Sequence, residues 1–340
     1  MAQRFVSHQF SASDMTDYIE HLESSNLKAS SVKTYKEKLK NLRRLFESRD
    51  LDWILSHPVN VGKKLFVAYE SPPTRKAHIS AVLSLFRHSP GLKSRYPEAQ
   101  KAWAQMFEKL ETEITLKYEN NEPSEKQLRN FVSWSEVLRK RKQLGAEDPD
   151  SPEYLLLCLY TMIPPVRADF NNVIILEEEP SKAVIARAPN YLLIDDFDDA
   201  EATKMTLCLN DYKTAGSGEN AKAYRKELPS DLVSVLRRSL NHYPRDHLIV
   251  SPKTGEPFHI DNSYIKYANQ ILARVFAPKR PTISLLRHSF ISQLDQNSLT
   301  VRERKEIAKD MMHSIDQQSL YAFVFKSPKN PKCSCFCDTD

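Results

Sequence analysis

The chain has 340 residues, of which 41% are apolar, and this length is enough for two domains that each bury a core. No apolar run approaches the roughly 18 residues of a membrane-spanning helix, and the first residues carry no apolar signal-peptide core. The five cysteines do not make a disulfide framework, which favours a reducing compartment. We therefore expect a soluble intracellular protein with no membrane partner.

The net charge of +5 is unevenly distributed along the chain. Residues 1–100 contain 16 Lys and Arg against 10 Asp and Glu, whereas the rest of the chain contains 33 against 34. A basic N-terminal part suits binding to a DNA duplex, because lysines and arginines release counterions from the phosphates, although an ordinary solvated surface has the same composition. None of the six glycines lies in a motif typical of a phosphate-binding loop, which excludes most nucleotide-driven enzymes.

The first part of the chain, residues 10–115, is predicted to be helical with short connections. Apolar residues recur three and four positions apart within residues 15–22, 32–46 and 79–86, which places them on one side of each helix. The opposite sides of the second and third helices are basic, and we predict that they lie against DNA phosphates. These two faces carry Lys33, Lys36, Lys40, Arg43 and Arg44 on the second helix, and Arg75 and Lys76 on the third.

The stretch KYENNEPS at residues 117–124 loses the apolar periodicity and contains a proline and two adjacent asparagines, which is typical of a linker. We therefore predict a helical domain over residues 1–117, a linker over 118–124, a second domain over 125–325 and a tail over 326–340. The tail contains CSCFC, whose one-residue gaps do not match the ligand spacing of zinc sites. We expect a disordered end and no metal there.

The second domain is predicted to begin with two helices. Ser133 and Glu136 have the spacing of a capping box, which opens a helix that ends near Leu144. An apolar helix follows from Pro152 to Met162, and the two prolines after it end that helix.

The pattern then changes to short runs with the period of β-strands. These runs are NVIIL, YLLID, MTLCL and AYRKELP, and the segment KTAGSGENAK between the last two is predicted to be a long hairpin tip. Helices return at Ser230–Leu240, Asn262–Phe276, Ile283–Leu294 and Thr300–Asp310, the last of which opens with a second capping box. Because strands and helices do not alternate regularly, a Rossmann arrangement is excluded. We predict a mainly α fold with a small antiparallel β-sheet.

The second domain contains residue types suited to breaking a phosphodiester without a metal ion. A guanidinium group stays protonated and donates two parallel hydrogen bonds, so two arginines can bind both non-bridging oxygens. A lysine beside them can protonate the leaving 5′ oxygen, and a tyrosine that stays attached to the phosphate conserves the bond energy for rejoining. The candidates occur in the order Arg167, Lys213, Arg287, His313 and Tyr321.

This order resembles the catalytic domain of the tyrosine recombinase (phage-integrase type) family. In that family an early arginine is followed by a lysine on a β-hairpin, by an H-x-x-R motif on a later helix, and by a His or Trp shortly before the tyrosine. The resemblance covers roughly residues 10–325 and is stronger in the second domain. The helical first domain looks like the core-binding domain of the family, so the resemblance implies a two-domain recombinase architecture.

The resemblance implies a site-specific recombinase or integrase that cleaves and rejoins double-stranded DNA through a 3′-phosphotyrosyl intermediate, with no metal and no cofactor. Tyr321 would attack the phosphate, while Arg167 and Arg287 bind the non-bridging oxygens. Lys213 would protonate the leaving 5′ hydroxyl, and His313 would assist by hydrogen bonding. The resemblance also implies a DNA-associated tetramer on two DNA sites, and the apolar segment YAFVFKSP suits docking on a neighbouring protomer.

The sequence departs from the family pattern at several positions. Ser284, in SLLRH, replaces the first histidine of H-x-x-R, and whether the later His288 compensates is left open. Asp169 lies one position earlier than the acid usually found after the first arginine. Met312 stands where a glycine commonly precedes the second histidine. We keep Ser284 and His288 as further catalytic candidates.

Several alternatives stay open at this point. Tyr321 lies in a short aromatic run, where it can be a core residue, and Tyr267 is then the alternative nucleophile. A type IB topoisomerase uses a similar tyrosine and arginine set, but it relaxes supercoils as a monomer. A catalytically degenerate, recombinase-derived DNA-binding protein would bind DNA without cutting it. The leading prediction is the recombinase or integrase.

Overall fold

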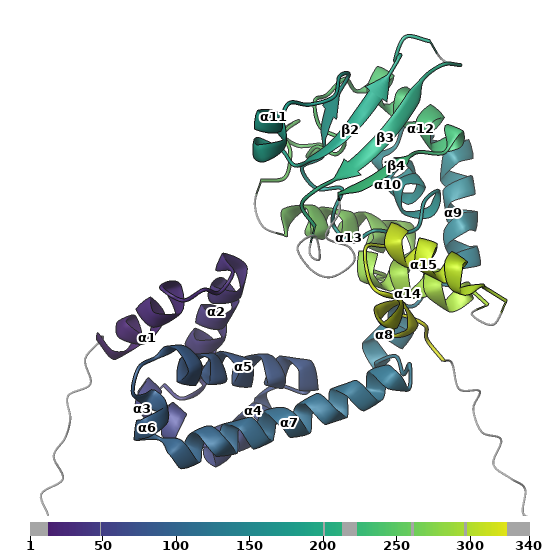
Figure 1. The fold of residues 1–340 in the computed structure, drawn as a ribbon. Coiled ribbons are helices and arrows are strands. Elements are labelled where there is room, and N and C mark those ends of the chain that lie inside the picture. The colour runs from purple at the N-terminus through teal and green to yellow at the C-terminus, as the bar shows by residue number, and fades with distance from the viewer. Residues whose placement is uncertain are drawn as a thin grey trace, which may run out of the picture. The chain divides into compact units, whose positions relative to one another are not determined.

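The computed structural model describes residues 13–47, 49–199, 201–212, 223–259, 262–295 and 298–324 (Figure 1). The chain divides between Asn120 and Asn121 into two compact units, each with its own buried apolar core. The helix before this division extends to Glu119, so the first residues of the predicted linker are helical. The assignment of the first unit to DNA binding and of the second to catalysis remains a prediction.

The first unit is helical throughout its described elements. Trp103 is a fully buried residue of its core, and it donates its indole N–H to the backbone oxygen of Leu55 at 2.9 Å. The predicted apolar stripes face this core, as Leu39 and Leu42 show in the second helix and Val82 in the fifth. The helices are α1 (Ser13–Glu23), α2 (Ala29–Leu45), α3 (Leu51–Ser56), α4 (Pro58–Ala68), α5 (Pro72–His88), α6 (Leu92–Arg95) and α7 (Pro97–Glu119).

The second unit contains the predicted long helices together with several short ones. Ser133 accepts a hydrogen bond from the backbone of Glu136, and Thr300 with Glu303 forms the complete capping box that the sequence predicted. The helices are α8 (Glu125–Asn130), α9 (Trp134–Glu147), α10 (Pro152–Thr161), α11 (Lys182–Arg187), α12 (Ser230–His242), α13 (Ser263–Val275), α14 (Ile283–Gln293), α15 (Val301–Asp310) and α16 (Ile315–Ser319).

The four strands lie at the predicted places, but the sheet is mixed. The strands are β1 (Ile174–Leu176), β2 (Asn190–Asp195), β3 (Lys204–Leu209) and β4 (Tyr224–Glu227), in the order β1-β2-β3-β4. β2 pairs antiparallel with β3, and β3 with β4, whereas β1 pairs parallel with β2. The prediction of a purely antiparallel sheet is therefore wrong. Its cause is α11, which the sequence reading missed, because a parallel pair needs a crossover of this kind between its strands.

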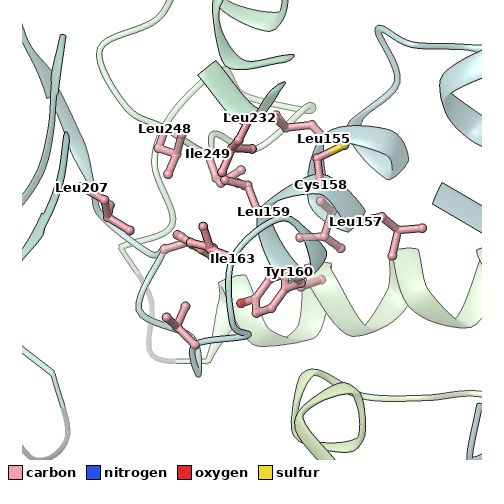
Figure 2. Close-up of a cluster of buried hydrophobic side chains, with 14 of the residues drawn as sticks. Leu155, Leu157, Cys158, Leu159, Tyr160, Ile163, Leu207, Leu232, Leu248 and Ile249 are labelled. Carbon is pink, nitrogen blue, oxygen red and sulfur yellow. The ribbon is translucent and has the colours of Figure 1, made fainter. Parts of the chain in front are cut away.

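The helix α10 lies at the centre of the second core, as Figure 2 shows. Its side chains are apolar on all sides, which is typical of a helix that is buried all round. Leu157 and Tyr160 are fully buried, and Leu207 of β3 and Leu232 of α12 belong to the same cluster. This buried helix leads directly into the loop that carries Arg167 and fixes where that loop begins.

Within the described part of the chain, no helix combines the length and the apolar character needed to cross a bilayer.

Candidate active site

The helix α14 places a fully buried arginine in the centre of the site. Thr282 caps the helix by accepting the backbone N–H of Leu285 at 3.2 Å. Arg287 is 0% exposed, and it donates Nη1 to the backbone oxygen of Pro165 at 2.5 Å and Nη2 to that of Met311 at 3.2 Å. Its Nε is buried and has no hydrogen-bond partner among the described residues. Burial lowers the pKa of Arg287, because the charged form loses its hydration.

A second arginine reaches the same turn from the loop after α10. The backbone oxygen of Arg167 accepts the hydroxyl of Tyr160 at 2.6 Å, so the core holds this loop in place. The Arg167 side chain donates Nη1 to the backbone oxygen of Met312 at 3.0 Å. Among the described residues no carboxylate forms a direct ion pair with Arg167 or Arg287, although the charge of Asp169 acts on both. Two positive charges therefore converge on a turn whose acceptors are neutral carbonyl groups.

The turn at Met311 and Met312 has an unusual backbone conformation. Met312 has φ 54°, which is the left-handed region that glycine adopts most easily. Glycine would adopt this conformation with less strain than methionine does. In this conformation two consecutive backbone oxygens accept hydrogen bonds from different arginines. The oxygen of Met311 accepts from Arg287, and that of Met312 accepts from Arg167.

The half-buried Tyr321 lies against both guanidinium groups. The Cζ of Arg287 is 5.0 Å from the centre of its ring, and the ring of His313 stacks on it at 5.6 Å with an interplanar angle of 15°. Burial alone would raise the pKa of Tyr321, but the charges and hydrogen bonding of Arg287 and Arg167 outweigh burial and lower this pKa below its ordinary value. A phenol with a lowered pKa is a better nucleophile near neutral pH, because more of it is ionised.

His313 is a buried side chain. Burial, followed by the charge of Arg287, lowers its pKa to about 4. Its Nδ1 lies 3.0 Å from the backbone oxygen of Ser314, and a carbonyl only accepts, so Nδ1 carries the proton and Nε2 keeps its lone pair. In this tautomer Nε2 is an acceptor, so His313 can assist by accepting a hydrogen bond.

His288 contacts the backbone of the tyrosine segment. Its Nδ1 lies 2.7 Å from the backbone oxygen of Tyr321, and its ring stacks on Phe323 with centres 4.1 Å apart. Burial lowers the pKa of His288 to about 4. Ser284, by contrast, is exposed on the first turn of α14 and makes no hydrogen bond with a described residue.

Three further residues of the sequence analysis are Lys213, Asp169 and Tyr267. Lys213 lies outside the described residues, between β3 and β4. Asp169 is half-buried and accepts the backbone N–H of Arg167 at 3.0 Å, although burial raises the pKa of its carboxyl. Tyr267, the alternative nucleophile, lies on α13 with its ring 5.0 Å from that of Phe258. It has no described contact with Arg167 or Arg287.

Sequence reasoning missed the groups that hold the two arginines. These are the backbone oxygens of Pro165, Met311 and Met312, and no side-chain pattern indicates a carbonyl acceptor. It also missed Phe323 as the stacking partner of His288, although the aromatic run at residues 321–325 was visible.

The predicted DNA-binding residues fall into two groups in the first unit. On α2, Lys33, Lys40, Arg43 and Arg44 are exposed, and Lys36 forms an ion pair with Glu23 at 2.5 Å. The two residues of α5 are half-buried and engaged within the unit. The guanidinium of Arg75 lies 4.6 Å from the ring of Phe66, and Lys76 forms an ion pair with Glu111. The exposed basic face is therefore on α2.

Among the described residues, no group of three or more His, Cys, Asp or Glu side chains is arranged to hold a metal ion.

Comparison with known proteins gives only distant structural likenesses. No family model matches the chain, and no curated protein matches it. Among solved structures, the chain is similar to a XerA recombinase, with 14% identity and a TM-score of 0.37 over 92% of this chain and 93% of the other. A likeness this distant assigns neither a family nor an activity, so the function is inferred from the residues of the site.

Proposed function

We propose that this protein cleaves and rejoins DNA through a covalent bond between Tyr321 and a 3′ phosphate, as a site-specific recombinase or integrase. One observation carries the proposal. The hydroxyl of Tyr321 lies against two guanidinium groups, those of Arg167 and Arg287, and no described carboxylate forms a direct ion pair with either of them.

The charge balance of the site favours a bound phosphate. The guanidinium of Arg287 forms no direct ion pair, and the nearby charge of Asp169 offsets its desolvation only in part, because burial still lowers its pKa. A phosphodiester supplies both a negative charge and oxygen acceptors, including one for the unpartnered Nε–H of Arg287. The same two guanidinium groups lower the pKa of Tyr321, so they would act on both the phosphate and the attacking tyrosine oxygen.

The reaction needs no outside energy source. Tyr321 loses its phenolic proton to water, its oxygen attacks the phosphorus, a P–O bond to tyrosine forms, and the bond to the 5′ oxygen breaks. The leaving 5′ oxygen takes a proton, which we assign to Lys213, and His313 assists by hydrogen bonding. Rejoining reverses these steps when a 5′ hydroxyl attacks the phosphotyrosine. The arginines act by stabilising the charge that develops on the non-bridging oxygens.

We assign double-stranded DNA as the partner. The exposed basic face of α2 would bind its phosphates in the first unit, and residues 1–117 and 125–325 would be the DNA-binding and catalytic domains. A tetramer on two DNA sites stays part of the proposal. The start of the apolar segment that we expected to dock on a neighbour packs within its own unit, since Val324 donates its backbone N–H to Asn121 at 3.1 Å.

A nicked duplex that traps the covalent intermediate tests the proposal. The wild-type protein is expected to form an adduct, and peptide mapping should locate it at Tyr321. Tyr321→Phe should bind the duplex and form no adduct. Tyr267→Phe is the matched control, because it removes the same hydroxyl from another half-buried tyrosine and should leave adduct formation intact. An adduct that survives Tyr321→Phe eliminates this nucleophile.

A second candidate function is DNA binding without cleavage. It is favoured by the exposed Ser284 in place of the family's histidine, and by the carbonyl partners that already engage Arg167 and Arg287. It predicts shifted DNA bands and no adduct with the wild-type protein. A plasmid relaxation assay separates both from a type IB topoisomerase, which would relax supercoils as a monomer.

A further inference from the structure

The segment that carries Tyr321 is attached to α14 by two hydrogen bonds on one side of that helix. His288 Nδ1 lies 2.7 Å from the backbone oxygen of Tyr321, and the backbone N–H of Phe323 donates to Ser292 Oγ at 2.9 Å. His288 and Ser292 are four residues apart, so they lie on the same face of the helix, one turn above the other. Together they bracket the backbone from residue 321 to residue 323.

Ring contacts strengthen this attachment. The Phe323 ring lies parallel to that of His288, with centres 4.1 Å apart and an interplanar angle of 10°. The ring of Phe131 lies 5.9 Å away on a tilted plane. All of these residues belong to one unit of one chain. The nucleophile candidate is therefore held by contacts within its own chain.

The hydrogen bonding and pKa of His288 suit a residue that positions the tyrosine segment and not one that transfers protons. A backbone carbonyl only accepts hydrogen bonds, so Nδ1 must carry the proton and the ring is in a single tautomer. Burial lowers the pKa of His288 to about 4, so this neutral form is present at neutral pH. The nitrogen that faces the active-site segment is thus committed to the backbone of Tyr321.

We propose that His288 and Ser292 form a clasp, in which His288 Nδ1 and Ser292 Oγ fix residues 321–323 on α14 and thereby position the Tyr321 hydroxyl against the arginines. His288 directly follows Arg287, so a single rigid helix sets the distance between the phosphate-binding guanidinium and the backbone of the nucleophile. Small errors in such a distance are costly, because misplacement by about 1 Å can slow a reaction by about 10²-fold. This inference rests on the proposed function, and it makes His288 a positioning residue.

Three variants of the full-length protein test the clasp. In His288→Asn the amide nitrogen takes the place of Nδ1, whereas in His288→Gln the same group lies one methylene further along the side chain. Ser292→Ala removes only the acceptor of the Phe323 N–H. We would measure the single-turnover rate of adduct formation on a nicked duplex at saturating protein, its pH profile, the DNA affinity and the thermal unfolding of each variant.

We expect His288→Gln and Ser292→Ala to slow adduct formation by about 10-fold to 100-fold at unchanged DNA affinity. His288→Asn should retain the wild-type rate to within about threefold, with the wild-type pH profile, because the donor is preserved. If His288 transferred protons, the rate of adduct formation in His288→Asn would instead lose the pH dependence that His288 contributes. If the Gln variant unfolds, Ser292→Ala decides the result.

Hydrogen exchange separates this inference from the proposed function. In the free protein, the Phe323 amide should exchange faster in Ser292→Ala than in wild type, whether or not the protein cuts DNA. A wild-type protein that forms no adduct overturns the proposed function, and the clasp is then judged by exchange alone. Unchanged exchange in Ser292→Ala overturns the clasp. The clasp is also overturned if His288→Gln and Ser292→Ala both form the adduct at the wild-type rate, or if His288→Asn forms it no faster than His288→Gln.

Discussion

Basic residues occur in two very different environments in this chain. On α2 of the first unit, Lys40 and Arg44 are exposed to solvent. In the second unit, Arg287 is fully buried and Arg167 half-buried, and both donate to backbone carbonyls. An exposed charge is hydrated and screened by salt, so it adds modestly to the binding of any duplex. A buried charge that forms no direct ion pair costs free energy, and a ligand of opposite charge can offset that cost.

Substitution of the buried arginine is expected to have the largest effect. Arg287→Ala should lower the rate of adduct formation by on the order of 10²–10³-fold or more, because it removes a charged donor from the transition state. Arg287→Lys keeps the charge but loses the planar fork, so it should rescue the rate only in part. Arg139→Ala, which removes an exposed arginine of the same unit, is the matched control. A wild-type rate in the Ala variant would show that this buried charge has no catalytic part.

The buried histidines should make stability depend on pH. The pKa of His288 and that of His313 are lowered to about 4, whereas an unfolded histidine titrates near 6.5. The unfolded chain therefore binds more protons between these values, and stability falls as the pH decreases from about 6.5 to about 4. The slope is at most about 1.4 kcal/mol per pH unit for each histidine.

Denaturant unfolding at several pH values measures this slope. His313→Asn should reduce it, whereas the same change at the exposed His242 should leave it as in wild type. An equal slope in wild type and His313→Asn would show that this side chain is not buried in its neutral form.

The turn that serves both arginines gives a smaller and more local test. Met312→Gly and Met312→Ala both lose the same buried side chain, but only glycine tolerates φ 54° without strain. The Gly variant should therefore be more stable than the Ala variant by about 1 kcal/mol. Thermal unfolding measures the order of the two, and a more stable Ala variant contradicts the left-handed turn.

The exposed charges should have the smallest individual effects. Lys40→Ala and Arg44→Ala should each weaken binding to all duplex sequences alike and reduce the slope of log affinity against log salt by about 1. Lys76→Ala is the matched control, since Lys76 is half-buried and already paired with Glu111. Equal effects of Lys40→Ala and Lys76→Ala on DNA affinity would show that the ion pair with Glu111 does not prevent Lys76 from binding DNA.

The sequence predicted the elements better than their pairing. Apolar periodicity placed the four strands and the helices from Ser230 to Asp310 close to their observed bounds, because periodicity is a local property of the chain. It did not reveal that β1 runs parallel to β2, since the direction of pairing depends on the path of the intervening α11.

The residue order Arg167, Arg287, His313 and Tyr321 was chosen from sequence, and the structure brings these four side chains together. Their catalytic roles remain predictions. The carbonyl acceptors of Pro165 and Met311 could not be predicted, because every residue has a carbonyl and only the folded backbone decides where it points.

By itself, the sequence determined which chemical groups are available to a site and which stretches form helices and strands, because side-chain chemistry and apolar spacing are local properties of the chain. Only the tertiary structure decided that Arg287 is buried without a direct ion pair, and that His288 contacts the backbone of Tyr321. Burial and the direction of a carbonyl arise from contacts between segments far apart in sequence, and no local pattern specifies them.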